Sequence, residues 1–222
     1  MNIAPFIDHT ILKNTTTARH VSILCNEAIQ YHFASVCVPP YYVQDAKRSV
    51  EGTTVKVVTV IGFPFGYHHY KAKLHEAELA INDGAGELDM VMNIAAFKSN
   101  DTAYLEAEIE AVSKLTYERK KTLKVIIESG LLSDEEIIKC CGLYSHFPIQ
   151  FLKTSTGFAE KSASVHAVQL MRKHLPAHIQ IKASGGIKTY AFAKELIDAG
   201  ATRLGCSASV PIINGELPEA SY

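Results

Sequence analysis

The chain has 222 residues, of which 47% are hydrophobic, and its 22 lysine and arginine residues nearly match its 23 aspartate and glutamate residues. This length supports one sizeable core and predicts a single domain spanning residues 1–222. The formal net charge of −1 gives no overall field that would attract nucleic acid or an anionic membrane, so neither is expected as a partner.

The N-terminal segment is not expected to be a signal peptide, because Asp8 and His9 interrupt its only apolar stretch and no basic leader precedes it. The sequence also lacks a run of about 18 apolar residues, which a membrane-spanning helix needs. The cysteines are odd in number and scattered, without paired metal-ligand spacing: Cys25, Cys37, Cys140, Cys141 and Cys206. This pattern predicts reduced, buried thiols and a cytoplasmic protein.

Short apolar, β-branched segments recur along the chain and predict strands, while the stretches between them show helical spacing. Leu74, Ala77 and Ile81 follow the helical rhythm, and Ser133 with Glu136 forms a capping-box pattern. Eight strands alternating with helices favour an α/β fold, a parallel (β/α)8 TIM barrel, over an open doubly wound sheet. The predicted strands are residues 6–10, 35–38, 55–61, 87–92, 123–128, 150–154, 179–183 and 203–205.

Charged residues occur in several of these strands, although strands covered on both faces are normally apolar. They alternate with apolar residues, so they share one side of each strand. If the apolar side packs on the helices, Asp89, Glu128, Lys153 and Lys182 point into the barrel near its carboxyl end, where barrel enzymes keep their reactive groups. A structural ion pair is the alternative for each residue taken alone.

Lys153 and Lys182 lie on consecutive predicted strands and are therefore expected to be neighbours. Two ammonium groups about 7 Å apart repel by roughly 2.4 kcal/mol at an effective dielectric constant near 20, or about 1.7 pKa units. Burial lowers a lysine pKa as well. A lysine made neutral in this way can attack a carbonyl carbon to form an imine, although either lysine could instead bind a phosphate group directly.

Three of the predicted strands are followed by short turns of small residues, which allow backbone N–H groups to approach an anion. Phosphate groups commonly bind at the last loops of such barrels. The candidate phosphate-binding residues are Thr156, Gly157, Gly185, Gly186, Gly205 and Ser207.

The ten histidines do not predict a metal site. His68 and His69 are adjacent and point apart, and no acidic partner stands at ligand spacing in that stretch. We expect His68, His69 and His75 to lie on the surface.

Several motifs resemble those of the 2-deoxyribose-5-phosphate aldolase family. The strongest are ELDMVMN at residues 87–93, KTSTGF at 153–158 and KASGGI at 182–187. The phrases IDHT, VCV, VIGFPFG, VIIE and GATRLG follow the order of the family and extend the resemblance over nearly the whole chain.

The resemblance implies reversible cleavage of 2-deoxy-D-ribose 5-phosphate to glyceraldehyde 3-phosphate and acetaldehyde, in deoxyribonucleotide catabolism and without a metal or organic cofactor. It implies that Lys153 forms the Schiff base, that Lys182 lowers its pKa, and that Asp89 moves protons through water. Asp8 and Thr10 are accessory candidates for the floor or the hydroxyl-binding part of the pocket. A homodimer is expected from the family only.

The sequence also departs from the family. Ala208 follows Ser207 where relatives often have a second hydroxyl residue, which predicts weaker phosphate binding. Pro39 and Gly130 differ from the family residues in loops. Some relatives end in a tyrosine that assists proton transfer, so Tyr222, at the end of a tail predicted to be flexible from about residue 214, is a further accessory candidate.

Three alternatives to this function stay open from the residues alone. The first is a phosphate-binding isomerase or epimerase, in which the lysines bind phosphate and Asp89 and Glu128 move a proton. The second is a non-catalytic protein that binds a sugar phosphate, and the third is a related Schiff-base aldolase with other substrates.

Overall fold

The computed structural model describes residues 1–216. Its strands form one closed parallel barrel in which each strand pairs with the next along the chain and the last pairs with the first. This confirms the predicted (β/α)8 barrel and excludes the open sheet. The strands are β1 (Ile7–Thr10), β2 (Ser35–Val38), β3 (Lys56–Ile61), β4 (Glu87–Val91), β5 (Thr122–Ile126), β6 (Phe151–Lys153), β7 (Gln180–Ser184) and β8 (Arg203–Cys206).

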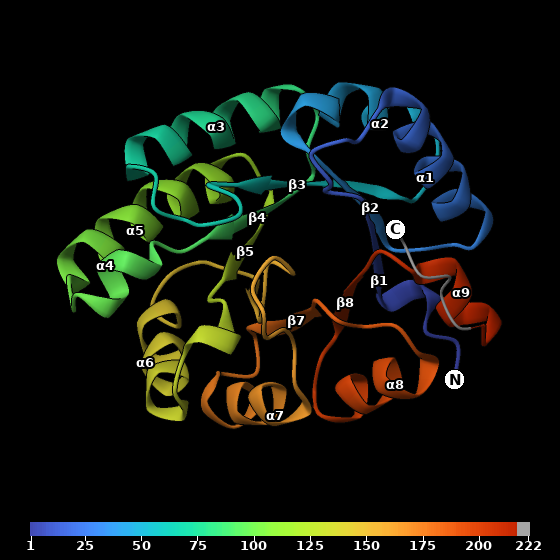
Figure 1. Ribbon diagram of the computed structural model, residues 1–222. Helices are drawn as coiled ribbons and strands as arrows, with labels where there is room; N and C mark the ends of the chain where they lie inside the picture. The colour runs from blue at the N-terminus through green and yellow to red at the C-terminus, as the bar shows by residue number, and fades with distance from the viewer. Residues whose placement is uncertain (217–222) are drawn as a thin grey trace.

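The helices surround the strands as an outer ring, which Figure 1 shows. Short 3-10 turns cover Ala4–Phe6, Pro40–Tyr42 and Ser129–Leu131. The α-helices are α1 (Ala18–Gln30), α2 (Val43–Ser49), α3 (Tyr70–Asn82), α4 (Ile94–Lys98), α5 (Thr102–Glu118), α6 (Asp134–Tyr144), α7 (Val165–His174), α8 (Tyr190–Asp198) and α9 (Ser209–Asn214).

Local sequence signals set several helix boundaries. The predicted capping box begins α6, where the Ser133 hydroxyl accepts from the backbone N–H of Glu136 and the Glu136 side chain accepts from that of Ser133. Ala77 and Ile81 are buried on the inner face of α3, as their spacing predicts. No helix within residues 1–216 is both long and apolar enough to cross a membrane.

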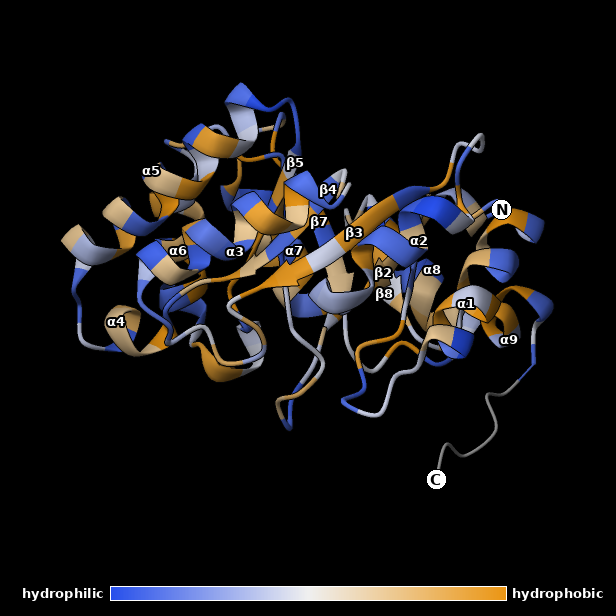
Figure 2. Cartoon of the chain, turned by 90° about the horizontal axis from the view of Figure 1, so that it is seen from above, coloured by the Kyte–Doolittle hydropathy of each residue, from blue (hydrophilic) through white to orange (hydrophobic). Residues whose placement is uncertain are grey.

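Alternate residues of the strands point to opposite sides, and this creates two separate apolar regions. Leu88 and Met90 of β4 belong to the large core between strands and helices. Cys37, Val58 and Val60 form a small cluster of their own on the other side of β2 and β3. Figure 2 shows β3 as an almost continuously hydrophobic strand. The predicted division of each strand into a helix-facing and an inward side is therefore confirmed.

The structure differs from the expected boundaries at one place that matters for the site. β5 ends at Ile126, so Glu128 lies beyond the strand, with φ 51°. The last helix, α9, ends at Asn214, near the residue at which the tail was expected to begin, and is capped by Gly215. Residues 217–222, and with them the accessory candidate Tyr222, lie outside the described residues.

Candidate active site

The interior of the barrel holds a cluster of buried charged side chains. Burying a charge is costly unless an opposite charge and hydrogen bonds compensate it, so these residues are expected to contact one another. They come from β1 and from the five strands β4 to β8, and they are Asp8, Glu87, Asp89, Lys124, Lys153, Lys182 and the half-buried Arg203.

Asp89 binds both predicted lysines. The amines of Lys153 and Lys182 each donate to Oδ2 of Asp89 at 2.7 Å. Parallel pairing of β6 and β7 sets the two lysines side by side in register. The prediction that the two lysines are neighbours is therefore confirmed. The Asp89 carboxylate lies between them, however, and it offsets part of the repulsion expected between two ammonium groups.

The pKa values of the two lysines shift in opposite directions, although both amines contact the same carboxylate. Burial lowers the pKa of Lys153, contact with Asp89 opposes this, and the charge of Lys182 adds to the lowering. Burial also acts to lower the pKa of Lys182, but Asp8 and Asp89 outweigh it and raise that pKa above its ordinary value. Lys153 is thus the amine that loses its proton more easily, and Lys182 remains a cation.

Asp89 itself is a strong anion. Burial acts to raise its pKa, but Lys124, Lys153 and Lys182 outweigh burial and hold the pKa well below the ordinary value of 3.8. The carboxylate is fully buried beneath the amine of Lys153. Its position therefore suits holding and orienting the lysine better than accepting a proton directly.

The third lysine of the cluster, Lys124, is missing from the candidate site residues, although it too alternates with apolar residues in its strand. Its amine contacts Asp89 at 2.9 Å and Glu87 at 2.6 Å. Arg203 was missed altogether, although it alternates with buried Leu204 in the way that marked the other inward residues. The strand parity was the signal that could have found both.

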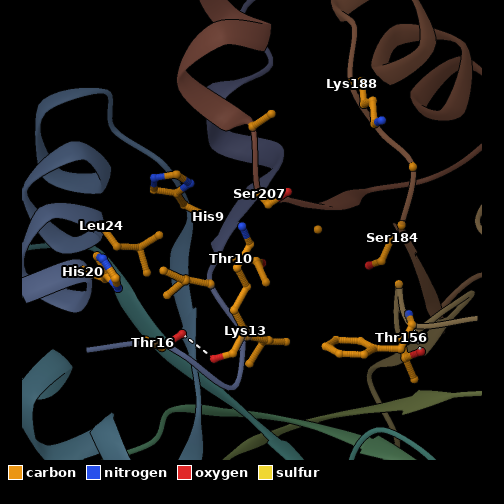
Figure 3. A pocket seen from close by; sticks show the side chains of 18 of the residues that line it. His9, Thr10, Lys13, Thr16, His20, Leu24, Thr156, Ser184, Lys188 and Ser207 are labelled. Carbon is orange, nitrogen blue, oxygen red and sulfur yellow. Dashed lines mark hydrogen bonds between the residues drawn. The ribbon is translucent and has the colours of Figure 1, made fainter. Parts of the chain in front are cut away.

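A cavity of about 780 Å³ opens above this cluster. Lys153 lines it, whereas Asp89, Lys124 and Lys182 lie beneath its wall. Figure 3 shows Thr156, Ser184 and Lys188 on one side of the cavity and His20 and Leu24 on the other. Lys153 is therefore the one lysine of the buried charge cluster that a small molecule in this cavity can reach.

The candidate phosphate-binding residues also lie at this cavity, because the loops that follow β6, β7 and β8 all line it. Gly185 and Gly186 have φ values of 86° and 73°, which favour glycine. A Cβ atom at Gly205 would lie 2.5 Å from the Ser184 hydroxyl, so any larger residue there would require the Ser184 side chain to move. The residues of the set that line the cavity are Thr156, Gly157, Gly185, Gly186, Gly205 and Ser207.

Thr156 differs from the others because its donors are already occupied. Its backbone N–H and its hydroxyl both donate to the Glu128 carboxylate, the former at 3.2 Å. Glu128 is 3% exposed, and burial raises its pKa. Glu128 therefore supports the loop after β6, which corrects the expectation that it points into the barrel as a strand residue.

The two accessory candidates within the described residues take different positions. Asp8 is fully buried and contacts Lys182 at 2.5 Å and Arg203 at 2.6 Å, so it belongs to the charge cluster under the cavity. It is not among the residues that line the cavity, and its place beneath the cavity wall is compatible with the floor of the pocket. Thr10 does line the cavity, and its hydroxyl donates to the carbonyl of Asp8 at 2.8 Å.

Two more lining features were missing from the sequence analysis. Lys188, beyond the Gly185–Gly186 turn, adds a lysine to the side of the cavity formed by the loop after β7. His20 and Leu24 of α1 form part of the opposite wall. The three histidines that were expected on the surface, His68, His69 and His75, are exposed, and the five cysteines are buried and free, as predicted.

A (β/α)8 barrel with a buried, pKa-lowered lysine at the carboxyl end of a strand is the arrangement of a Schiff-base aldolase. The model of the family described as DeoC/LacD family aldolase matches residues 3–209, and the chain belongs to this family. This supports the aldolase among the alternatives above, and not the isomerase or the non-catalytic binding protein.

Similar proteins agree with this assignment. A deoxyribose-phosphate aldolase of Streptococcus pneumoniae is 44% identical over 222 residues, which covers 100% of both chains. A structure from Coccidioides immitis, provisionally described as a deoxyribose-phosphate aldolase, is 41% identical with a TM-score of 0.92, covering 96% of this chain and 85% of that one. A deoxyribose phosphate aldolase from Aeropyrum pernix, described as tetrameric, is 30% identical with a TM-score of 0.89, covering 96% and 89%.

Proposed function

We propose that this protein reversibly cleaves 2-deoxy-D-ribose 5-phosphate to glyceraldehyde 3-phosphate and acetaldehyde through an imine on Lys153. One observation carries the proposal: Lys153 combines a lowered pKa with a place on the wall of the cavity. The other two lysines of the buried cluster have raised pKa values and lie beneath the wall. The names of the similar proteins support the choice of substrate.

The reaction begins when the neutral amine of Lys153 adds to the aldehyde carbon C1 of the open-chain sugar. Loss of water from the adduct gives a protonated imine, and the charged Lys182 beside it keeps the amine neutral before the attack. Asp89 holds the Lys153 amine at 2.7 Å and so fixes the direction from which it approaches the substrate. Protons move between the adduct and water in the cavity.

The protonated imine then accepts the electron pair of the breaking C2–C3 bond. The C3 hydroxyl loses its proton as C3 becomes the aldehyde of glyceraldehyde 3-phosphate, and C1 and C2 remain on Lys153 as an enamine. Protonation of C2 and addition of water release acetaldehyde and restore the free amine. The imine serves as the electron sink, so this scheme requires neither a metal nor an organic cofactor.

The phosphate group would bind on the opposite side of the cavity from α1. The turn at Gly185 and Gly186, the open backbone at Gly205 and the exposed hydroxyl of Ser207 line that side, and Lys188 supplies a positive charge. Ala208 lines the cavity without a hydroxyl, in keeping with the expectation of weaker phosphate binding.

We also propose a homodimer that works in the cytoplasm on deoxyribonucleotide-derived sugar phosphates. Five free, buried cysteines support a reducing compartment. A similar protein from Aeropyrum pernix is described as tetrameric, so sedimentation of the purified protein is needed to decide between a dimer and a tetramer.

Trapping of the imine tests the central proposal. The protein is incubated with acetaldehyde and cyanoborohydride, and the modified residue is located by peptide mass spectrometry. We expect one ethyl group on Lys153, no such adduct in Lys153→Ala, and turnover at least about 1000-fold lower in that variant with the fold retained. An unmodified Lys153 under conditions in which the enzyme turns over would refute the mechanism.

A comparison of substrates tests the assignment of the sugar phosphate. Turnover of 2-deoxyribose 5-phosphate should clearly exceed that of unphosphorylated 2-deoxyribose, because only the former can use the glycine turns and Lys188. Trapping on Lys153 combined with equal turnover of both sugars would keep the aldolase chemistry and reject the phosphate site. This outcome would favour a related Schiff-base aldolase.

A further inference from the structure

Six charged residues of the cluster, all buried except the half-buried Arg203, form a closed ring in which positive and negative side chains alternate. In order around the ring they are Arg203, Asp8, Lys182, Asp89, Lys124 and Glu87, with Glu87 contacting Arg203 again. The successive contacts are 2.6, 2.5, 2.7, 2.9, 2.6 and 3.3 Å long. Each member of the ring therefore touches one member of opposite charge on either side.

The ring is electrically balanced, since three cations alternate with three carboxylates. Lys153 is not a member of the ring, because it contacts one ring residue, Asp89, and not two. A proton on Lys153 would therefore give the buried cluster one unbalanced positive charge. The surplus charge of the cluster thus falls on the amine that faces the cavity.

The side of the ring that contains Glu87 and Arg203 lies away from the cavity. Glu87 opens β4 and lies two residues before Asp89, and Arg203 opens β8. Neither residue lines the cavity. Both residues are nonetheless linked to Asp89. Glu87 contacts Lys124, which contacts Asp89. Arg203 contacts Asp8, which contacts Lys182, and Lys182 contacts Asp89.

We propose that Arg203 and Glu87 are positioning residues that set the protonation state of the Lys153 amine from the opposite end of the barrel. They act by completing the neutral ring and touch neither substrate nor reacting atoms. This inference rests on the proposed role of Lys153 and extends it to two residues that lie outside the cavity.

The two residues should act in opposite directions. Without the charge of Arg203 the ring carries a net negative charge, which favours a proton on Lys153. Without the charge of Glu87 the ring carries a net positive charge, which disfavours that proton. Besides Lys153 and the six ring members, the charged and titratable groups near this region are Lys56 near Glu87, Cys37 on β2, Glu128 after β5 and Cys206 on β8.

The test measures how the rate of acetaldehyde trapping on Lys153 depends on pH, in the full-length protein. We compare the wild type with Arg203→Met, Glu87→Gln and the double variant under the same cyanoborohydride conditions. Arg203→Lys retains the charge with a different shape. Glu108→Gln is the matched control, because Glu108 is a buried carboxylate paired with Lys73 outside the barrel ring.

We expect the midpoint of the acid limb to move up by about 1 pH unit in Arg203→Met and down by about 1 unit in Glu87→Gln. The double variant should return near the wild-type midpoint, and Arg203→Lys and Glu108→Gln should keep it. The pH profile of kcat/KM for the sugar phosphate should move in the same way.

The inference would be overturned if both single variants kept the wild-type midpoint of the acid limb. It would also be overturned if both midpoints moved in the same direction. Thermal unfolding of each variant identifies any that does not fold. If one single variant does not fold, the direction in which the midpoint moves in the other single variant tests the inference. A residue with a purely structural role would lower the trapping rate without moving the midpoint. Failure to trap any adduct in the wild type would instead reject the proposed function itself.

Discussion

The amines of Lys153 and Lys182 donate to one and the same oxygen atom, Oδ2 of Asp89, at equal distances of 2.7 Å. Of these two lysines, only Lys153 lines the cavity. Lys182 has a second carboxylate, Asp8, at 2.5 Å, whereas Lys153 has Asp89 alone. This difference of one carboxylate explains why the pKa values of the two lysines shift in opposite directions.

The lowered pKa of Lys153 predicts that this residue costs the protein stability. Between the folded pKa and the ordinary value of 10.5, the unfolded chain binds a proton that the folded protein does not. Stability therefore falls as pH decreases through this window. Lys153→Met, which keeps the volume, should gain stability relative to the wild type at pH 7, and this gain should shrink as pH rises toward about 10.5.

Chemical denaturation of both proteins at several pH values between 7 and about 11 measures this difference. Lys173→Met, at an exposed position at the end of α7, is the control for removing a lysine charge from the chain. A variant less stable than the wild type at pH 7 would show that the ion pair with Asp89 outweighs the burial of the amine.

Replacing Asp89 should harm both stability and activity, because Asp89→Asn leaves three buried lysines without their common anion. We expect the free energy of unfolding to fall by about 3–5 kcal/mol at pH 7 and turnover to fall at least about 100-fold. The pKa of Asp89 lies well below 3.8, so its contribution is complete above that value and is lost as pH falls through the folded pKa.

Urea unfolding at pH 7 and at progressively lower pH follows the contribution of Asp89. Asp134→Asn removes an exposed carboxylate paired with His166 and should leave stability unchanged. If Asp89→Asn matched the wild type in stability, the lysines would not need this anion and the described charge cluster would lose its basis.

Lys188 predicts a selective effect on the phosphorylated substrate. Lys188→Met should raise KM for 2-deoxyribose 5-phosphate by about 10-fold, since a hydrogen bond to a charged group contributes about 1.5–3 kcal/mol. Turnover of unphosphorylated 2-deoxyribose should not change. Steady-state kinetics with both sugars, again with Lys173→Met as the control, measure this, and an equal loss with both sugars would argue against a phosphate contact.

Ala208 offers the opposite test at the same site, because Ala208→Ser adds a hydroxyl to the wall of the cavity. We expect KM for the phosphorylated sugar to decrease by about 3- to 10-fold, which corresponds to one added hydrogen bond. The rate with the unphosphorylated sugar serves as the internal reference. An unchanged KM would mean that the phosphate does not reach this part of the loop after β8.

Much of this architecture could be predicted from local patterns. The strand–helix alternation predicted the barrel, and the alternation of charged and apolar residues placed Asp89, Lys153 and Lys182 on its inward side. These predictions succeed because side chains of a strand alternate with a period of two, so the sequence by itself states which residues share a face. Glu128 was misplaced where this rule stops, since β5 ends two residues before it.

Other features depend on contacts between distant parts of the chain. The loops after β6, β7 and β8 were predicted from their small residues, whereas the opposite wall of the cavity comes from α1 and gives no chemical signal in the sequence. Lys188 was missed for a similar reason, because an exposed lysine in a helix-leading loop looks like any other surface charge.

The sequence by itself therefore determined the barrel, the inward side of its strands and the pair of lysines, because these follow from the fixed geometry of strands and from neighbouring strand order. The tertiary structure alone decided which lysine faces the cavity and how its charge is compensated. Asp8 meets Arg203 only because β1 pairs with β8 and closes the barrel. The neutral ring around Asp89, and with it the distinct state of Lys153, exists only in the closed barrel.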